Sequence, residues 1–100
     1  MEINSILSAS THHLRRDTAD WLEAQAAKSA PALIVYSKHD YGFFVYVPDD
    51  ESLQLSLVDK ELQTKYELLG LIWLARYRNA RWLELDRDAV VEAALPLWDW

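Results

Sequence analysis

Two apolar stretches rich in β-branched and aromatic residues lie close together, at residues 32–36 and 43–47. The polar residues between them end in Gly42, and Pro48 follows the second stretch. Strand-forming runs joined by a short loop with a glycine are typical of a β-hairpin. The pattern therefore predicts two antiparallel strands in this part of the chain.

Strands are also predicted near both ends of the sequence. Apolar and polar residues alternate over residues 2–8, which favours a short strand. Residues 82–85 show the same alternation and predict another strand, followed by a turn at 86–88. Residues 89–93 are then expected to return as a strand or a short helix.

Helical spacing of apolar residues marks two further regions. The first predicts a helix over residues 15–28, which ends before Pro31 because a residue preceding proline avoids helical backbone. The second predicts a helix from Val58 to Arg78 with one apolar stripe. That stripe consists of Val58, Leu62, Tyr66, Leu69, Trp73 and Tyr77. This helix is apolar nearly all round in its second half, so we expect it to be deeply buried or covered by a partner. Residues 53–57 fit either a strand or a loop packed on the core.

The predicted order of elements is β-α-β-β-α-β with a C-terminal extension. This order is the signature of a ferredoxin-like sandwich, an α+β fold in which two helices cover one face of a mainly antiparallel sheet. The chain has 100 residues and shows no repeat or linker. We therefore expect a single domain over residues 1–100.

The composition narrows the classes of function. Cysteine is absent, which excludes disulfides, thiol nucleophiles and cysteine-based metal sites. Asp and Glu outnumber Lys and Arg by 16 to 10, and the net charge of −6 disfavours direct binding to nucleic acid phosphates. The sequence has no apolar run long enough to span a membrane and no basic signal-peptide region at Met1. A cytoplasmic protein is expected.

Few residues suggest catalysis or metal binding. The histidines His12, His13 and His39, with Asp40, fit no standard zinc spacing and are more simply explained as loop residues. Asp86 and Asp88 on either side of Arg87 are typical of a turn, although paired carboxylates also serve acid–base catalysis. No phosphate-binding loop or nucleophile motif is present. We expect a protein that is not an enzyme and that holds neither a cofactor nor a metal.

Several side chains are candidates for binding a partner. Tryptophan and tyrosine dominate the energetics of protein interfaces, and the chain has five of each. The acidic turn before the second helix is a candidate contact for basic side chains. Trp21, Trp73 and Trp82 are assigned to core packing. The candidate partner-binding residues are Asp49, Asp50, Glu51, Tyr41, Phe43, Trp98 and Trp100. The basic residues Arg76, Arg78, Arg81 and Arg87 fit either a solvated helix end or a contact with an anion.

Five short segments, in this order, are similar to members of one family. They are Ser10–Leu14, Pro31–Tyr36, Tyr41–Pro48, Trp82–Asp88 and Leu95–Trp100. Together they resemble a family of small proteins of unknown function carried on bacterial plasmids and integrative elements. Residues 57–80 depart from that family's pattern, because they are longer and more apolar. The resemblance implies no catalytic residue, but it implies a mobile-element context, in which small acidic proteins include antirestriction and anti-CRISPR proteins.

Three hypotheses about function follow. The first is a non-enzymatic inhibitor that binds a host protein or nucleoprotein complex, with counter-defence as its most concrete form. The second, kept as the alternative, is a homodimeric accessory or regulatory module that self-associates through its second helix or a sheet edge. The third is a small hydrolase or metal enzyme built on the histidines. Because the sequence has few residues capable of catalysis, we favour the first hypothesis.

Overall fold

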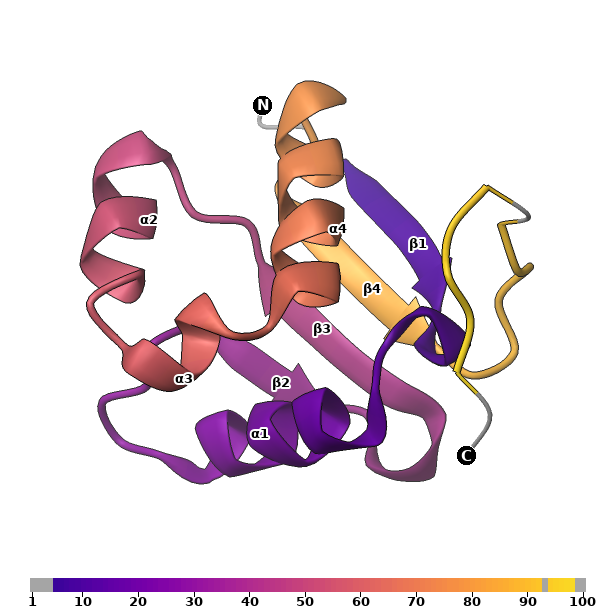
Figure 1. Cartoon of the computed structure of the whole chain (residues 1–100), viewed down its shortest axis with the longest axis horizontal. Coiled ribbons are helices and arrows are strands. Elements are labelled where there is room, and N and C mark those ends of the chain that lie inside the picture. Colours follow the sequence, from indigo (N-terminus) through magenta and orange to yellow (C-terminus); the bar gives the residue numbers. More distant parts are fainter. Residues whose placement is uncertain (1–4, 93, 99–100) are drawn as a thin grey trace.

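The computed structural model describes residues 5–92 and 94–98 (Figure 1). Four strands form one sheet, and α-helices and two short 3-10 turns connect them. In chain order the elements are β1 (Ile6–Ser10), η1 (Thr11–His13), α1 (Arg16–Ala27), β2 (Val35–Ser37), η2 (His39–Tyr41), β3 (Gly42–Tyr46), α2 (Asp50–Ser56), α3 (Lys60–Gln63), α4 (Tyr66–Tyr77) and β4 (Trp82–Asp86). The α+β class, the first helix, the hairpin and the last strand are therefore confirmed.

The order of strands in the sheet is β1-β4-β3-β2, so the ferredoxin-like arrangement was wrong. A ferredoxin-like sheet has its first strand inside, whereas here β1 lies at the edge and pairs in parallel with β4. The other neighbouring pairs are antiparallel. Burial agrees with this order, because on the core side of the sheet Leu83 and Leu85 of β4 are fully buried, whereas their partners in β1 are the partly buried Leu7 and the small Ala9. The strand with the stronger apolar alternation takes the inner position.

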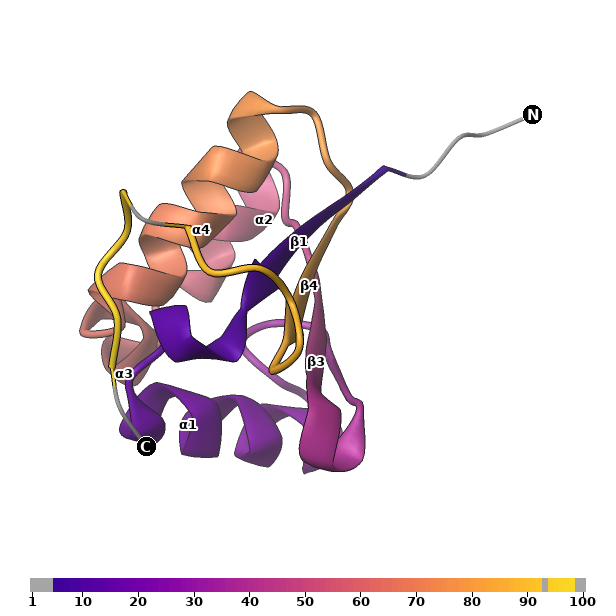
Figure 2. The same ribbon diagram turned by 90° about the vertical axis from the view of Figure 1, so that its right-hand side faces the viewer.

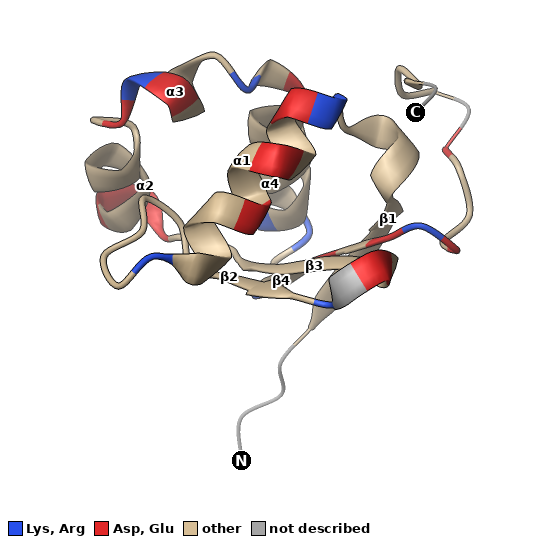
Figure 3. Ribbon diagram, turned by 90° about the horizontal axis from the view of Figure 1, so that it is seen from below, with Lys and Arg blue, Asp and Glu red and all other residues tan. Residues whose placement is uncertain are grey.

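The α-helices α1 to α4 lie on the same side of the sheet (Figures 2 and 3). Side chains of a strand alternate between the two faces, so every second residue points toward the helices. Val35, Phe43, Val45, Leu83 and Leu85 do so, and they form one hydrophobic core with residues of the helices. The opposite face of the sheet is not covered by any described helix.

Gly42 begins β3 at a point where the backbone of two strands comes very close. Its φ angle is 135°, which is strained for any residue with a side chain. A Cβ atom added there would lie 1.8 Å from the carbonyl oxygen of Leu85. Glycine is thus required at position 42, the end of the predicted hairpin loop, both by the positive φ angle and by the close Leu85 carbonyl.

The region expected to be one long helix is divided into α3 and α4. Asp59 caps α3, since its Oδ1 accepts the backbone N–H groups of Glu61 at 2.9 Å and Leu62 at 3.1 Å. Thr64 and Lys65 then separate the two helices. Residues 50–56 form the separate helix α2, so the strand or loop predicted over 53–57 was also wrong.

Two polar contacts attach this region to α1. The carboxylate of Glu67, at the start of α4, accepts hydrogen bonds from Arg15 Nε at 2.7 Å and Thr18 Oγ1 at 2.8 Å. The ammonium of the buried Lys65 lies 3.2 Å from Asp17 Oδ2. A hydrogen bond from Lys65 is the largest cause that lowers the pKa of Asp17 below its ordinary value. The break between α3 and α4 therefore lies directly over α1.

The C-terminal segment is attached to the fold by His13, whose side chain is buried. The backbone N–H of Glu92 donates to Nε2 at 2.9 Å, so the neutral ring carries its proton on Nδ1, which donates to the carbonyl of Pro96 at 2.9 Å. The backbone N–H of Trp98 also donates to the carbonyl of His12. The described residues among 89–93 are irregular, so neither the strand nor the helix predicted there is found.

None of the helices in the described ranges is long and apolar enough to cross a membrane.

Candidate partner-binding surfaces

The sheet face that no described helix covers carries a group of large apolar side chains. We call it the aromatic face, and it consists of Ile6, Tyr36, Phe44, Tyr46 and Trp82. Strand register brings them together, because Trp82 stands between Ile6 of β1 and Tyr46 of β3, and Phe44 stands beside Tyr36 of β2. In each of β2, β3 and β4 the neighbouring residues point to the core.

Trp82 lies at the centre of the aromatic face. Its ring centroid is 5.2 Å from that of Tyr46, 5.9 Å from that of Tyr36 and 6.5 Å from that of Phe44. A shallow hollow of about 250 Å³ is lined by Ile6, Tyr36, Phe44 and Trp82. Tyr36 is 59% exposed and Ile6 is 53% exposed. Exposed apolar residues grouped in this way mark interaction sites more often than scattered ones do.

A charged triad borders the aromatic face. The Nζ atom of Lys38 lies 2.7 Å from Asp86 Oδ2 and 2.8 Å from Glu84 Oε2, and 5.1 Å from the centre of the Phe44 ring. Hydrogen bonds to Asp86 and Glu84 raise the pKa of Lys38 above its ordinary value. The hydrogen bonds that Lys38 donates lower the pKa values of Glu84 and Asp86. Two carboxylates against one ammonium leave the triad with one net negative charge.

An acidic groove of about 460 Å³ continues from this triad toward the C-terminal segment. It is lined by Ser8, Glu84, Asp86, Asp88, Ala89, Val90 and Glu92. The described residues that line the groove thus include four carboxylates and no basic side chain. Ser8 Oγ donates to Glu84 Oε1 at 2.7 Å, which joins the groove to the edge strand. The aromatic face and the acidic groove lie side by side, so together they can hold an apolar side chain next to a cationic one.

The outer face of α4 is a second exposed apolar surface. The exposed residues of this helix are Tyr66, Gly70, Trp73 and Tyr77. The assignment of Trp73 to core packing was therefore wrong, since the residues of α4 that are buried are Leu68, Leu71, Ile72 and Ala75. The helix is apolar on both sides, so the periodicity of its apolar residues did not identify the inner one.

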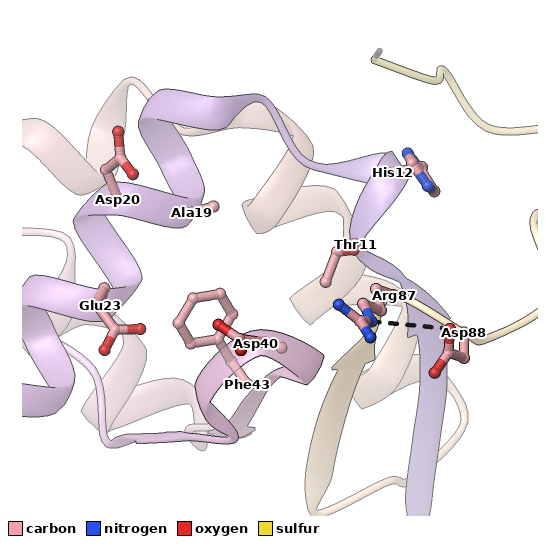
Figure 4. Close-up of a pocket in the computed structure, with 10 residues that line it drawn as sticks. Thr11, His12, Ala19, Asp20, Glu23, Asp40, Phe43, Arg87 and Asp88 are labelled. Carbon is pink, nitrogen blue, oxygen red and sulfur yellow. Dashed lines mark ion pairs between the residues drawn. The ribbon is translucent and has the colours of Figure 1, made fainter. Parts of the chain in front are cut away.

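A hollow of about 540 Å³ lies between α1, η1 and the start of β3 (Figure 4). Its lining residues are Thr11, His12, Ala19, Asp20, Glu23, Asp40, Gly42, Phe43, Arg87 and Asp88. Asp20 and Glu23 come from α1, whereas Arg87 Nε lies 3.9 Å from Asp88 Oδ1 and stacks its guanidinium on Tyr41. No group of three or more His, Cys, Asp and Glu side chains in the described ranges could hold a metal ion.

The residues predicted to bind a partner do not form one surface. Asp49 caps α2 by accepting the backbone N–H of Ser52 at 2.8 Å, and Asp50 pairs with Arg76. Glu51 is exposed in the first turn of α2. Figure 1 places α2 on the opposite side of the molecule from the C-terminal segment that carries Trp98. The acidic turn therefore has a structural role at the start of α2.

The aromatic candidates fall into different environments. Phe43 is buried in the core and lines the hollow beside α1, so it offers little surface to a partner, and its role in binding stays a prediction. Tyr41 is 52% exposed and is covered on one side by Arg87, whose guanidinium lies 4.7 Å from the ring centre. Trp98 is half-buried in the C-terminal segment. Trp100 lies outside the described residues.

The other candidate groups have partners in the fold. Arg76 contacts Asp50 and lies over the Trp73 ring at 4.7 Å, while its Nη1 atom is buried without a hydrogen-bond partner among the described residues. His13 holds the C-terminal segment, and His12 is half-buried in η1. The side chain of His39 lies outside the described part of the chain. The expectation of a protein without enzymatic activity remains a prediction.

Sequence reasoning missed Tyr36, Phe44, Tyr46 and Trp82 as one surface. Trp82 was expected in the core, whereas it lies on the uncovered face of β4. A signal for this was present, because each of these aromatic residues stands next to an aliphatic core residue in its strand, as Tyr36 follows Val35. When aliphatic and aromatic residues alternate, the aromatic positions share the other face of the sheet.

Comparison with known proteins supplies a family but no activity. No match was found among curated proteins or among solved structures. Residues 6–100 match the C-terminal domain of a family of unknown function, DUF5983. This match supports the expected resemblance to an uncharacterised family, and carriage on plasmids or integrative elements stays a prediction. Because it covers nearly the whole chain, the chain belongs to the DUF5983 family through that family's C-terminal domain.

Proposed function

We propose that this domain is a non-enzymatic protein-binding module and that the aromatic face is its contact surface. The observation that carries the proposal is the position of Trp82. Its ring contacts three other aromatic rings on a sheet face that no described helix covers. Aromatic side chains at the centre of a surface patch are the usual energetic core of a protein interface.

The partner we propose is an extended protein segment with an apolar side chain and a Lys or Arg two positions apart. On β4, Trp82 and Glu84 are two residues apart and point to the same face. In an extended partner segment, side chains two residues apart are separated by about 6.7 Å, the same spacing. The apolar side chain would enter the hollow at Trp82, and the cation would contact the net negative charge around Glu84 and Asp86.

Charge favours a protein partner over a nucleic acid. Aromatic residues on a sheet also stack with unpaired bases, and such surfaces combine stacking with basic side chains that bind phosphates. Here the border of the aromatic face carries Glu84 and Asp86, whose charges exceed that of Lys38, and the whole chain carries −6. A phosphate backbone would be repelled from this surface.

The narrower form of the proposal is an inhibitor of a host protein or nucleoprotein complex that acts in counter-defence. It rests on the resemblance to proteins of mobile elements. The acidic surface beside an aromatic contact supports it physically, because proteins that handle nucleic acids present basic segments of the kind described above.

Site-specific photo-crosslinking tests the proposal. We would place benzoyl-phenylalanine at Tyr36, on the aromatic face, and at Ala27, exposed on α1, and irradiate cells that naturally carry the gene. We expect a saturable crosslink to one protein from position 36 and not from position 27. Trp82→Ala should reduce that crosslink, whereas Trp73→Ala on the helical side should not.

Three results would contradict the proposal. One is equal crosslinking from positions 36 and 27. Another is a crosslink from position 36 that Trp82→Ala leaves unchanged while the variant keeps the far-ultraviolet circular dichroism of the original protein. The third is recovery of nucleic acid rather than protein at position 36, which would assign the aromatic face to base stacking instead.

A further inference from the structure

The outer face of α4 differs from an ordinary solvent-facing helix surface. Its exposed residues are Tyr66, Gly70, Trp73 and Tyr77, and none of them is charged. Tyr66 is 76% exposed, Trp73 is 56% exposed and Tyr77 is 85% exposed. The solvent side of a surface helix is usually charged or polar, so this one has the composition of a contact face.

The spacing of these four residues is that of a coiled-coil seam. They follow one another at intervals of four, three and four residues, which is the order d, a, d, a of a heptad. Such a seam packs against a second helix that carries the same pattern. We propose that α4 pairs antiparallel with α4 of a second copy of this chain, and that the domain is a homodimer through this face.

The antiparallel arrangement makes the seam complementary to itself. With the two-fold axis between residues 71 and 72, Gly70 faces Trp73 of the second copy and Tyr66 faces Tyr77 of the second copy. Each large indole therefore meets a position without a side chain. A parallel arrangement would instead place Trp73 against Trp73 and Gly70 against Gly70. The antiparallel pair also opposes the two helix dipoles favourably.

The surroundings of Gly70 provide room for the indole. A Cβ atom built at Gly70 would have no neighbour within 4 Å, so the chain itself does not require glycine there. Glycine inside a helix costs about 1 kcal/mol relative to alanine. A hollow of about 290 Å³ opens beside it, lined by His13, Glu67, Gly70, Leu71, Leu74, Leu95 and Pro96. If the Trp73 ring of a second copy occupies this hollow, the absence of a side chain at Gly70 is explained.

The three exposed rings supply about half of the area that a standard dimer interface needs. At about 200 Å² for each aromatic side chain, the exposed fractions of the three rings amount to roughly 400 Å² per copy. A standard interface buries about 800 Å² per partner, and the flanking residues of α4 and the C-terminal segment supply further area. The four seam residues are uncharged, and Arg76 beside Trp73 is paired with Asp50, so repulsion between two copies of net charge −6 acts mainly at longer range and falls with salt.

Sedimentation velocity over a range of protein concentrations tests the proposal. We expect the mass to rise from that of one chain toward that of two, and more readily at high salt. Trp73→Ala should raise the dissociation constant at least about tenfold, as the loss of an interface hot spot does. Gly70→Leu should abolish the dimer by filling the position opposite Trp73. Trp82→Ala on the aromatic face is the matched control and should leave the dimer unchanged.

Disulfide trapping tests the register, because the chain has no cysteine of its own. Tyr66→Cys and Tyr77→Cys proteins, mixed and oxidised, should form mainly the mixed disulfide. A parallel seam would instead give disulfides between identical variants and would overturn the proposed pairing. A single-chain mass at all concentrations, or a dimer indifferent to both Trp73→Ala and Gly70→Leu, would overturn the dimer. Neither result affects the crosslinking test at Tyr36, so this proposal and the proposed function fail independently.

Discussion

The Nε2 atom of His13 accepts a hydrogen bond at 2.9 Å from the backbone of Glu92, 79 residues further along the chain. On its other side the same ring donates to Pro96. The histidine is buried, and it holds a segment that has no regular secondary structure of its own. The described C-terminal segment is therefore held by one imidazole from the N-terminal part of the chain, together with the Trp98–His12 backbone bond and the packing of Leu95 on the core.

We predict that His13→Phe releases the C-terminal segment. The ring volume is kept, but the two hydrogen bonds are lost, and each backbone group left without its partner costs about 1–3 kcal/mol while it stays buried. Hydrogen exchange should therefore speed up at the amides of Glu92 and Trp98 and stay slow in β3. His12→Phe, in the same turn, is the control. Unchanged exchange at Glu92 in His13→Phe would show that packing alone holds the segment.

We predict that Glu67→Gln destabilises the contact between α1 and α4. The carboxylate is 7% exposed and accepts hydrogen bonds from Arg15 and Thr18. An amide of the same shape loses the charge that faces Arg15, so the free energy of unfolding should fall by about 1–3 kcal/mol. Urea denaturation measures the change. Glu61→Gln, at an exposed position of α3, should change it by less than about 0.5 kcal/mol.

We predict that the triad around Lys38 makes stability depend on pH. The pKa values of Glu84 and Asp86 are lowered in the folded protein, so their contribution is complete above their unfolded values, near 4. It is lost as the pH falls through the lowered folded values. The pKa of Lys38 is raised, so its contribution is complete below about 10.4 and is lost as the pH rises beyond the folded value.

The variant Lys38→Met tests this pH dependence. Without the ammonium, the pKa values of Glu84 and Asp86 should return toward their ordinary range. Free energies of unfolding measured between pH 2 and 7 should then decrease less steeply with acid than in the original protein. Lys60→Met, an exposed position of α3, should leave the slope unchanged. Equal slopes in all three proteins would show that the triad does not link folding to protons.

We predict opposite effects for alanine at the two glycines. Gly42→Ala should prevent stable pairing of β3 with β4, because the new Cβ meets the Leu85 carbonyl and the φ angle is positive. Gly70→Ala should raise the free energy of unfolding of the monomer by up to about 1 kcal/mol, since its Cβ meets open space. Thermal unfolding at low protein concentration compares the two. Similar effects of both variants would contradict this reading of the two positions.

Local patterns in the sequence predicted most of the elements but not their arrangement. A run of β-branched and aromatic residues located β3, the pattern of residues 82–85 located β4, and helical spacing together with Pro31 located α1. The order of strands depends on which strand has the more apolar inner face, and this comparison between Leu83 and Leu85 of β4 and Leu7 and Ala9 of β1 is not a local property. The break before α4 was missed because Asp59 and Thr64 were read as part of a continuous helix.

The candidate surfaces were harder to predict for a related reason. Trp73 and Trp82 were expected in the core because large aromatic residues are usually buried. Whether such a residue faces the core depends on which side of its element is covered, and α4 is apolar on both sides. The alternation of aliphatic and aromatic residues in the strands was the signal that indicated the aromatic face.

The inner position of β4 has a consequence for how the protein is made. Ser8 of β1 and Glu84 of β4 are partners 76 residues apart, and β4 is the last of the four strands of this sheet in chain order. During translation, β1 and the hairpin have no common neighbour until residues 82–86 have left the ribosome. The sheet can therefore close only after β4 has been synthesised, and until then the nascent chain exposes unpaired strand edges.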